Sequence, residues 1–251
     1  MAPGGFAVID RKLNYGRDVV RDFASAVAPF SSVLDIGAGS GADLALAKAA
    51  SPGAALHAIE SYPPNVRTLA AQGIDVACIN VERERLPFAD EALDLVMANQ
   101  VLEHLKDIFW VFHEVSRTLK VGGHFILGVP NLASLHNRLL LSVGYQPTCI
   151  QNHSAHVRGY TRHDLMRLFT MAFPGGYTLE RFRGSNFYPL PPILARPAAR
   201  LMPNAAASIF LLLKKQRAYA GEFLEHPVRC KLESNFYLGE QAGAGETAHK
   251  V

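Results

Sequence analysis

Residues 33–41 read Val-Leu-Asp-Ile-Gly-Ala-Gly-Ser-Gly. The apolar residues among 33–36 are typical of a short buried strand. Three glycines at alternate positions allow a sharp turn and a close backbone approach to a ligand, because no Cβ stands in the way. A helical pattern begins at Ala42, so this glycine loop leads directly into a helix N-terminus. A strand, a glycine loop and a helix in this order predict a nucleotide-type binding site in an α/β fold.

The ligand class depends on the residue before the loop. Residues 37–42 also satisfy the loose dinucleotide pattern G-x-G-x-x-G/A, which is a weak signal by itself. Asp35 stands two residues before the first glycine, where a carboxylate is unfavourable beside a pyrophosphate and suits a positively charged ligand without phosphate. With Asp35, the stretch resembles motif I, D-x-G-x-G-x-G, of the class I S-adenosylmethionine (SAM) methyltransferases.

Two further motifs follow in the expected order. Residues 86–96, Leu-Pro-Phe-Ala-Asp-Glu-Ala-Leu-Asp-Leu-Val, are similar to the L-P-F-x-D-x-x-F-D-L-V run of the type 11 methyltransferases, with Leu93 in place of the usual Phe. Residues 99–104, Asn-Gln-Val-Leu-Glu-His, are similar to the N-x-V-L-E-H of that group. This resemblance covers about residues 30–215. It implies an α/β, Rossmann-like fold with a seven-stranded, mostly parallel sheet in the order 3-2-1-4-5-7-6, helices on both faces and a lid insertion after strand 5.

The resemblance also implies a domain organisation. We expect an N-terminal helical segment over 1–30, the methyltransferase domain over 31–217 and a C-terminal extension over 218–251. The substrate lid is expected at about 130–160 and 184–204. Within the extension, residues 218–240 are expected to form an arm or a small hairpin, and the tail from Ala242 is expected to be disordered.

Apolar residues between Val101 and Leu119 recur at helical spacing, which predicts one amphipathic helix. We expect Gly122 and Gly123 to end this helix and a fifth strand to follow over 124–129. In such a helix Gln100, Glu103 and His104 would share one face of the first turn.

The expected SAM-binding residues follow the carboxyl ends of the first four strands. Glu60 ends a predicted strand over 55–59 and lies 23 residues after Gly37, near the spacing at which an acid accepts ribose hydroxyls. Its alternative role is that of an acid at a helix N-terminus ahead of Pro63. In resembling enzymes the turn at Asn80 frames the adenine. The full predicted set is Asp35, Gly37, Ala38, Gly39, Gly41, Glu60, Ser61, Asn80, Val81, Glu82, Asn99 and Gln100.

The candidate catalytic residues are histidines. Methyl transfer to a hydroxyl requires removal of its proton, and an imidazole with a pKa near neutrality is the natural base. His104 follows the fourth strand, where parallel sheets place their ligands, and His156 lies in the predicted lid. Both are therefore expected to be catalytic.

A metal site is the less favoured interpretation of the same region. The small-RNA 2′-O-methyltransferases and the ubiquinone-pathway O-methyltransferases carry E-x-x-E-H here and a later His. This chain has Gln100 where they have the first Glu, and an amide is a weaker, neutral oxygen donor. We therefore expect SAM as the cofactor and no bound metal, with Gln100, Glu103, His104 and His156 as the alternative divalent-cation site.

The charge distribution bears on the acceptor. Residues 121–220 hold 11 Lys and Arg but only Asp164 and Glu180, a net charge of +9, whereas the whole chain carries +3. A solvated basic face is the ordinary explanation, but so one-sided a block also favours an anionic acceptor or surface. Three widely spaced cysteines suggest neither a disulfide framework nor a metal motif.

Localisation and partners follow from the same patterns. The N-terminus lacks a signal-peptide pattern, and the longest apolar run, 205–213, is too short to span a bilayer. We expect a cytoplasmic protein, with peripheral contact of residues 187–203 at the inner membrane face as an open alternative. The sequence does not specify an oligomeric state.

The predicted function is SAM-dependent O-methylation of an anionic or lipid-linked sugar, such as an envelope glycan intermediate. A quinone-like or other small phenol is the alternative acceptor, and a non-catalytic SAM-binding regulator is the alternative from another class. A nucleic-acid substrate is disfavoured, because no appended RNA-binding motif is evident.

Overall fold

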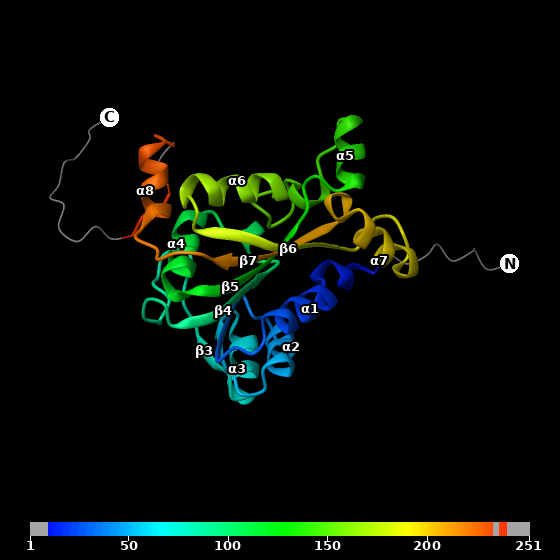
Figure 1. Cartoon of the computed structure of the whole chain (residues 1–251). Helices are drawn as coiled ribbons and strands as arrows, with labels where there is room; N and C mark the ends of the chain where they lie inside the picture. The colour runs from blue at the N-terminus through cyan, green and yellow to red at the C-terminus, as the bar shows by residue number, and fades with distance from the viewer. Residues whose placement is uncertain (1–9, 233–235, 240–251) are drawn as a thin grey trace.

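The computed structural model describes residues 10–232 and 236–239. Its centre is a seven-stranded sheet in the order β3-β2-β1-β4-β5-β7-β6, which confirms the predicted order (Figure 1). The strands are β1 (Ser32–Ile36), β2 (Ala55–Ile59), β3 (Asp75–Ala77), β4 (Leu93–Asn99), β5 (Leu119–Pro130), β6 (Tyr177–Ser185) and β7 (Ser208–Lys215). Only β7 runs antiparallel to its neighbours, β5 and β6.

Helices cover both faces of the sheet. They are α1 (Arg17–Val27), α2 (Ala42–Ala50), α3 (Pro63–Ala71), α4 (Ile108–Thr118), α5 (Leu135–Ser142), α6 (Arg162–Ala172), α7 (Pro192–Leu201) and α8 (Glu222–Arg229). Four 3-10 turns are η1 (Arg11–Tyr15), η2 (Leu102–His104), η3 (Thr148–Ile150) and η4 (Pro203–Ala205). In Figure 1, α1 and α2 lie on one side of the sheet and α4, α6 and α8 on the other.

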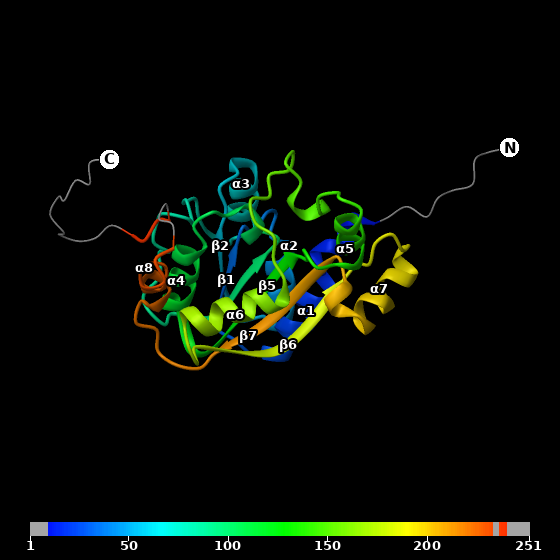
Figure 2. The same ribbon diagram turned by 90° about the horizontal axis from the view of Figure 1, so that it is seen from above.

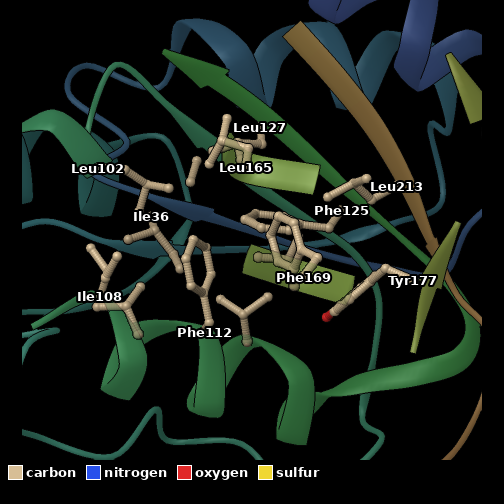
Figure 3. Packing of buried hydrophobic residues seen from close by; sticks show 14 of the residues in the cluster. Ile36, Leu102, Ile108, Phe112, Phe125, Leu127, Leu165, Phe169, Tyr177 and Leu213 are labelled. Atoms are coloured by element: carbon tan, nitrogen blue, oxygen red, sulfur yellow. The ribbon is translucent and has the colours of Figure 1, made fainter. Parts of the chain in front are cut away.

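The side chains of β1 alternate between two hydrophobic cores, as a strand buried on both faces requires. Leu34 and Ile36 belong to the core under α4, α6 and α8, and Val33 belongs to the core under α1 and α2. Figure 3 shows Phe112 of α4 and Phe169 of α6 in the first of these cores. The alternation places Asp35 on the α1 and α2 side of the sheet.

The predicted helix over 101–119 is wrong in one respect. The chain forms η2, then an extended residue at Leu105, and only then α4. The Glu82 carboxylate accepts hydrogen bonds from the backbone N–H groups of Lys106 and Asp107, at 2.6 and 2.9 Å. These hydrogen bonds from a distant loop hold the backbone just before Ile108, where α4 begins, so residues 101–107 are not part of the helix.

Two other expectations are corrected. β5 already begins at Leu119, so Gly122 and Gly123 lie within the strand and do not end a helix. The described residues beyond 217 form helix α8, packed against α4 and α6, where an arm or hairpin was expected. The tail from Ala242 lies outside the described residues.

A buried ion pair fixes the loop that follows β3. The Arg117 guanidinium donates to both carboxylate oxygens of Glu114, at 2.7 and 2.8 Å, and to the carbonyls of Leu86 and Phe88. Glu114 Oε2 also accepts from the N–H of Leu86, at 2.7 Å. The Leu-Pro-Phe motif is therefore held against α4 by charge-assisted hydrogen bonds.

We expect Glu114→Ala to lower the free energy of unfolding by about 3–5 kcal/mol, because it removes the buried carboxylate that accepts two hydrogen bonds from Arg117 and leaves only the exposed Asp90 to pair with this charge. Urea denaturation would measure the loss. Asp90 is the matched control: it also bonds Arg117, but its side chain is 73% exposed, so Asp90→Ala should cost less than about 1 kcal/mol. Equal losses in the two variants would contradict this assignment.

Candidate active site

The glycine loop requires glycine for two separate reasons. Gly37, Gly39 and Gly41 all have positive φ, at 71°, 56° and 86°. A Cβ on Gly37 would also lie 2.4 Å from a methyl carbon of Val101. The loop is tied to the end of β2, since the N–H groups of Gly37 and Ala38 donate to the carbonyl of Ile59.

Glu60 holds the loop from the other side. One carboxylate oxygen accepts from the N–H of Gly39 and the other from the N–H of Tyr62, both at 2.8 Å. Tyr62 is the N-cap residue of α3, so Glu60 makes the helix-start contact considered as its alternative role. Glu60 also lines a cavity, which leaves ribose binding as a prediction for the same carboxylate.

This glycine-loop cavity has a volume of about 580 Å³, within the usual range for small-molecule sites. It opens at the carboxyl ends of β1, β2 and β3. Its lining residues are Ile36, Gly37, Ile59, Glu60, Ser61, Cys78, Ile79, Asn80, Val81, Glu82, Val101, His104 and Leu105. Six predicted SAM-binding residues are among them: Gly37, Glu60, Ser61, Asn80, Val81 and Glu82. Sequence reasoning missed Cys78 and Ile79, because a thiol and an apolar side chain directly after a strand carry no motif signal.

The other six predicted SAM-binding residues do not line this cavity. They are Asp35, Ala38, Gly39, Gly41, Asn99 and Gln100. Asp35 is 2% exposed, and burial, together with the nearby carboxylates of Asp43 and Glu60, raises its pKa well above the usual range. The Asn99 amide donates to Asp43 Oδ2 at 2.7 Å and to the carbonyl of Tyr15 at 2.9 Å. Their contact with SAM stays a prediction.

A second cavity, of about 860 Å³, lies beside α5 and is called the α5 cavity here. It is lined by Arg11, Asn14, Gln100, Pro130, His136, Asn137, Leu139, Leu140, Ser142, Val143, Thr148, Cys149, Gln151, His156, Tyr188, Pro189, Ala207 and Ser208. Most of these belong to the two predicted lid segments. Figure 2 shows α5 and α7, which follow β5 and β6 in the chain, at the same end of the molecule.

The turn η1 is part of this cavity. It supplies Arg11 and Asn14, and the Asn186 amide donates to Asn14 Oδ1 at 2.8 Å. Together with the bond from Asn99 to the carbonyl of Tyr15, this contact attaches η1 to the ends of both β4 and β6. No motif in the sequence predicts that Arg11 and Asn14 line a cavity.

Two histidines separate the cavities. His104 lines the glycine-loop cavity, and His156 lines the α5 cavity. Their rings are in edge-to-face contact, with centroids 4.7 Å apart and planes at 80°. The His156 loop is attached to η2, because the carbonyl of Glu103 accepts from the N–H groups of Val157 and Arg158, at 2.8 and 3.2 Å. The structure thus brings together the two residues predicted to be catalytic.

Hydrogen bonds define the tautomer of each ring. His156 Nδ1 lies 2.8 Å from the carbonyl of Cys149, and His104 Nδ1 lies 3.3 Å from the carbonyl of Ala155. A carbonyl can only accept, so Nδ1 carries the proton and Nε2 keeps its lone pair. Burial lowers the pKa of His104 below the ordinary value, which favours the neutral ring. Either Nε2 can therefore accept a proton.

Glu103 lies beside the histidine pair, and its Oε2 has no hydrogen-bond partner among the described residues. Burial raises its pKa to about 7. Glu103, His104 and His156 can each offer a ligand atom within 4.8 Å of the others. These are donors that a divalent cation accepts.

Gln100 differs from the prediction that it shares a helix face with Glu103 and His104. Its φ is 57°, outside η2, and it lines the α5 cavity. Its Nε2 is buried without a hydrogen-bond partner in the described structure. The left-handed backbone at the end of β4 redirects the side chain, which a helical pattern cannot reveal.

Comparison with known proteins identifies the domain. Residues 34–127 match the family Methyltransf_11, described as a methyltransferase domain. This region runs from β1 into β5 and includes the glycine loop and the Glu103–His104 turn. The match shows a methyltransferase domain over residues 34–127, and the sheet order is that of the class I SAM-dependent methyltransferase fold.

Individual relatives are distant. An uncharacterized 37.1 kDa protein in transposon TN4556 of Streptomyces fradiae is 31% identical over 139 residues, which cover 54% of this chain and 37% of the relative. A malonyl-acyl-carrier-protein O-methyltransferase of Herminiimonas arsenicoxydans is 32% identical over 108 residues, which cover 43% of this chain and 40% of the relative. The matches therefore span less than half of the length of either relative.

Solved structures show the same fold. A SAM-dependent methyltransferase of Thermotoga maritima, described as a possible histamine N-methyltransferase, has a TM-score of 0.58 at 18% identity, covering 81% of this chain and 91% of that one. A plantazolicin methyltransferase in complex with a substrate analogue and S-adenosylhomocysteine (SAH) has a TM-score of 0.57 at 16% identity, covering 82% and 86%. At these identities the likeness concerns the fold.

We expect Glu60→Ala to weaken SAH binding by about 10- to 100-fold, because a carboxylate that bonds the glycine loop is removed. Calorimetric titration of both proteins would measure the change. Asp75→Ala is the control, since this carboxylate is 77% exposed and does not line the cavity. Unchanged affinity in Glu60→Ala would remove Glu60 from the cofactor site.

We expect Glu103→Gln to stabilise the protein near neutral pH. The raised pKa means that the folded state releases the Glu103 proton at a higher pH than the unfolded state does. The free energy of unfolding of the wild type therefore decreases as the pH rises from the ordinary glutamate pKa of 4.5 to about 7. Above that range the variant should gain up to about 3 kcal/mol, and the gain should vanish at acidic pH. Denaturation in EDTA at both ends of the range would test this, and a gain independent of pH would contradict it.

Proposed function

We propose that this protein transfers the methyl group of SAM to an oxygen atom of an acceptor bound in the α5 cavity. One observation carries the proposal: the glycine-loop cavity and the α5 cavity are lined by opposite members of one contacting histidine pair. A donor in the first cavity and an acceptor in the second would meet at that pair. Such positioning alone can contribute about 7–11 kcal/mol to catalysis.

The glycine-loop cavity has the groups that the donor requires. Glu60 offers carboxylate oxygens to the ribose, and the turn from Asn80 to Glu82 borders the adenine end. Asn80 Oδ1 already accepts from the N–H of Glu82 at 3.0 Å, but a carbonyl oxygen has two lone pairs and can accept a second bond. SAM supplies an electrophilic methyl group on a sulfonium.

His156 serves as the general base in this proposal. The acceptor oxygen forms a bond to the methyl carbon as the carbon–sulfur bond breaks, and the hydroxyl proton moves to His156 Nε2. The products are the methylated acceptor and SAH. The carbonyl of Cys149 holds the ring in the tautomer that this step requires. His104 is a positioning residue or the alternative base on the donor side.

The lining of the α5 cavity favours an amphiphilic, anionic acceptor. Leu139, Leu140 and Val143 offer apolar surface, while Arg11 can pair with a negative charge. Amide side chains at the wall suit sugar hydroxyls. A lipid-linked sugar, such as an intermediate of envelope glycan synthesis, has all three properties. The O-methyltransferase among the relatives is consistent with an oxygen acceptor.

A quinone-like or other small phenol is the second candidate acceptor. The rings of His136 and Tyr188 are in edge-to-face contact at 4.9 Å in the cavity wall. Such an aromatic pair can pack against a flat ring. Assays with a polyprenyl-phosphate-linked hexose and with catechol would distinguish the two classes.

We expect His156→Ala to lower kcat by about 10²–10⁴-fold on whichever probe is methylated, because the general base is lost. SAH affinity should be unchanged, since His156 does not line the glycine-loop cavity. His153→Ala, an exposed residue of the same loop, is the matched control.

Three results bear on alternatives. Turnover by His156→Ala at the wild-type rate would exclude His156 as the base. Complete loss of activity in EDTA, restored by a divalent cation, would assign Glu103, His104 and His156 to a metal site. SAH binding without methylation of either probe would favour a non-catalytic SAM-binding regulator.

A further inference from the structure

We infer that the face formed by α5 and α7 docks on a membrane surface that contains anionic lipid, so that the α5 cavity opens toward an acceptor anchored in the bilayer. The inference rests on the proposed function in one respect, the lipid-linked acceptor. It adds the part of the protein surface that would contact the membrane in which such an acceptor is anchored. The evidence is the exposed apolar side chains, their place around the cavity and the charges beside them.

Exposed apolar side chains are concentrated on this face. Of the sixteen large apolar side chains that are exposed in the described structure, nine lie in 135–145 and 193–202. We call these nine the apolar rim: Leu135, Leu139, Leu141, Val143, Tyr145, Ile193, Leu194, Leu201 and Met202. A concentration of this kind marks an interaction site, whereas single exposed apolar residues need no explanation.

The helix α7 has its small residues inward and its large residues outward. Ala195 and Ala199 are buried at 0% and 1% exposure, while Ile193 and Leu201 are 81% and 82% exposed. At 100° per residue, Ile193 and Leu201 lie on one side of the helix, two turns apart. A soluble helix normally has the opposite arrangement, and this one is suited to an apolar environment outside the protein.

The α5 cavity lies between α5 and the segment that leads into α7. Leu139 and Val143 of the apolar rim also line the α5 cavity, and they are 60% and 67% exposed. Tyr188 approaches from the α7 side and contacts His136. Figures 1 and 2 both show α5 and α7 at the same end of the molecule. The apolar surface is therefore continuous from the cavity wall to the outside.

The charges beside the apolar rim favour a membrane surface with anionic lipid. Residues 130–163 and 181–221 contain no Asp or Glu, so carboxylates within these segments do not oppose an anionic surface. Arg138 and Arg196 form no ion pair within the described residues, and Arg138 donates only to the main-chain carbonyls of Ala133 and Asn204. Exposed cations beside an apolar rim complement anionic headgroups.

Contact of this kind would be peripheral. None of the helices in the described part of the chain is long and apolar enough to cross a bilayer. Binding then depends on shallow insertion of the apolar rim and on attraction by the arginines, so it should respond to lipid charge and to salt.

Co-sedimentation with vesicles tests the inference. The full chain should bind vesicles that contain phosphatidylglycerol more tightly than vesicles of phosphatidylcholine alone, and salt should weaken this binding. Ile193→Ser combined with Leu201→Ser should reduce it about tenfold, because two apolar side chains can no longer insert. Neither residue lines a cavity. The matched control is Val228→Ser with Leu232→Ser, which removes exposed apolar side chains near α8.

Several outcomes would overturn the inference. These are failure of the wild type to bind phosphatidylglycerol vesicles, and equal binding by the rim variant. A wild-type dimer that the rim variant converts to monomer, without vesicle binding, would assign the rim to self-association. Vesicle binding needs neither SAM nor acceptor. A wild type that binds SAH but not vesicles therefore contradicts this inference alone, whereas a wild type that does not bind SAH contradicts the proposed function.

Discussion

One main-chain oxygen joins the two halves of the site. The carbonyl of Glu103 accepts from the N–H groups of Val157 and Arg158, and this pair of bonds holds the lid segment against the end of β4. The glycine-loop cavity is built from loops that follow β1 to β4, and most of the α5 cavity from segments that follow β5 and β6. The Arg158 guanidinium adds bonds to the carbonyls of Leu105 and Lys106, so the same junction places the rings of His104 and His156 in contact and brings the two cavities together.

The sequence was sufficient to predict an element where the local residue pattern and the burial of its side chains agree. Residue types alone predict β1 and its loop. Val33, Leu34 and Ile36 alternate between two cores, and the glycines after them adopt the positive φ that glycine allows. The sheet order came from the resemblance, since spacing does not specify where β7 inserts. The start of α6 is equally local, because the Thr161 hydroxyl accepts from the N–H of Asp164, as an N-cap threonine does.

Contacts between distant segments defined what pattern could not predict. Glu82 starts α4 from a loop more than twenty residues upstream, and a left-handed Gln100 redirects a side chain that helical spacing assigned to the face of Glu103. The α5 cavity combines η1, β4, the lid and the approach to α7, and no single stretch of sequence contains its pattern. Half of the predicted SAM-binding residues line the glycine-loop cavity. Of the other half, Gln100 lines the α5 cavity and the remaining residues line neither cavity.

The attachment of η1 has a consequence for how the protein can be diversified. Arg11 and Asn14 line the α5 cavity, the proposed acceptor site, although in the chain they precede β1. Under the proposed function, a change at either residue alters acceptor choice without touching a residue of the glycine-loop cavity. Exchange of η1 alone would then alter the selectivity for acceptors, while the strands and loops around the glycine-loop cavity stay the same.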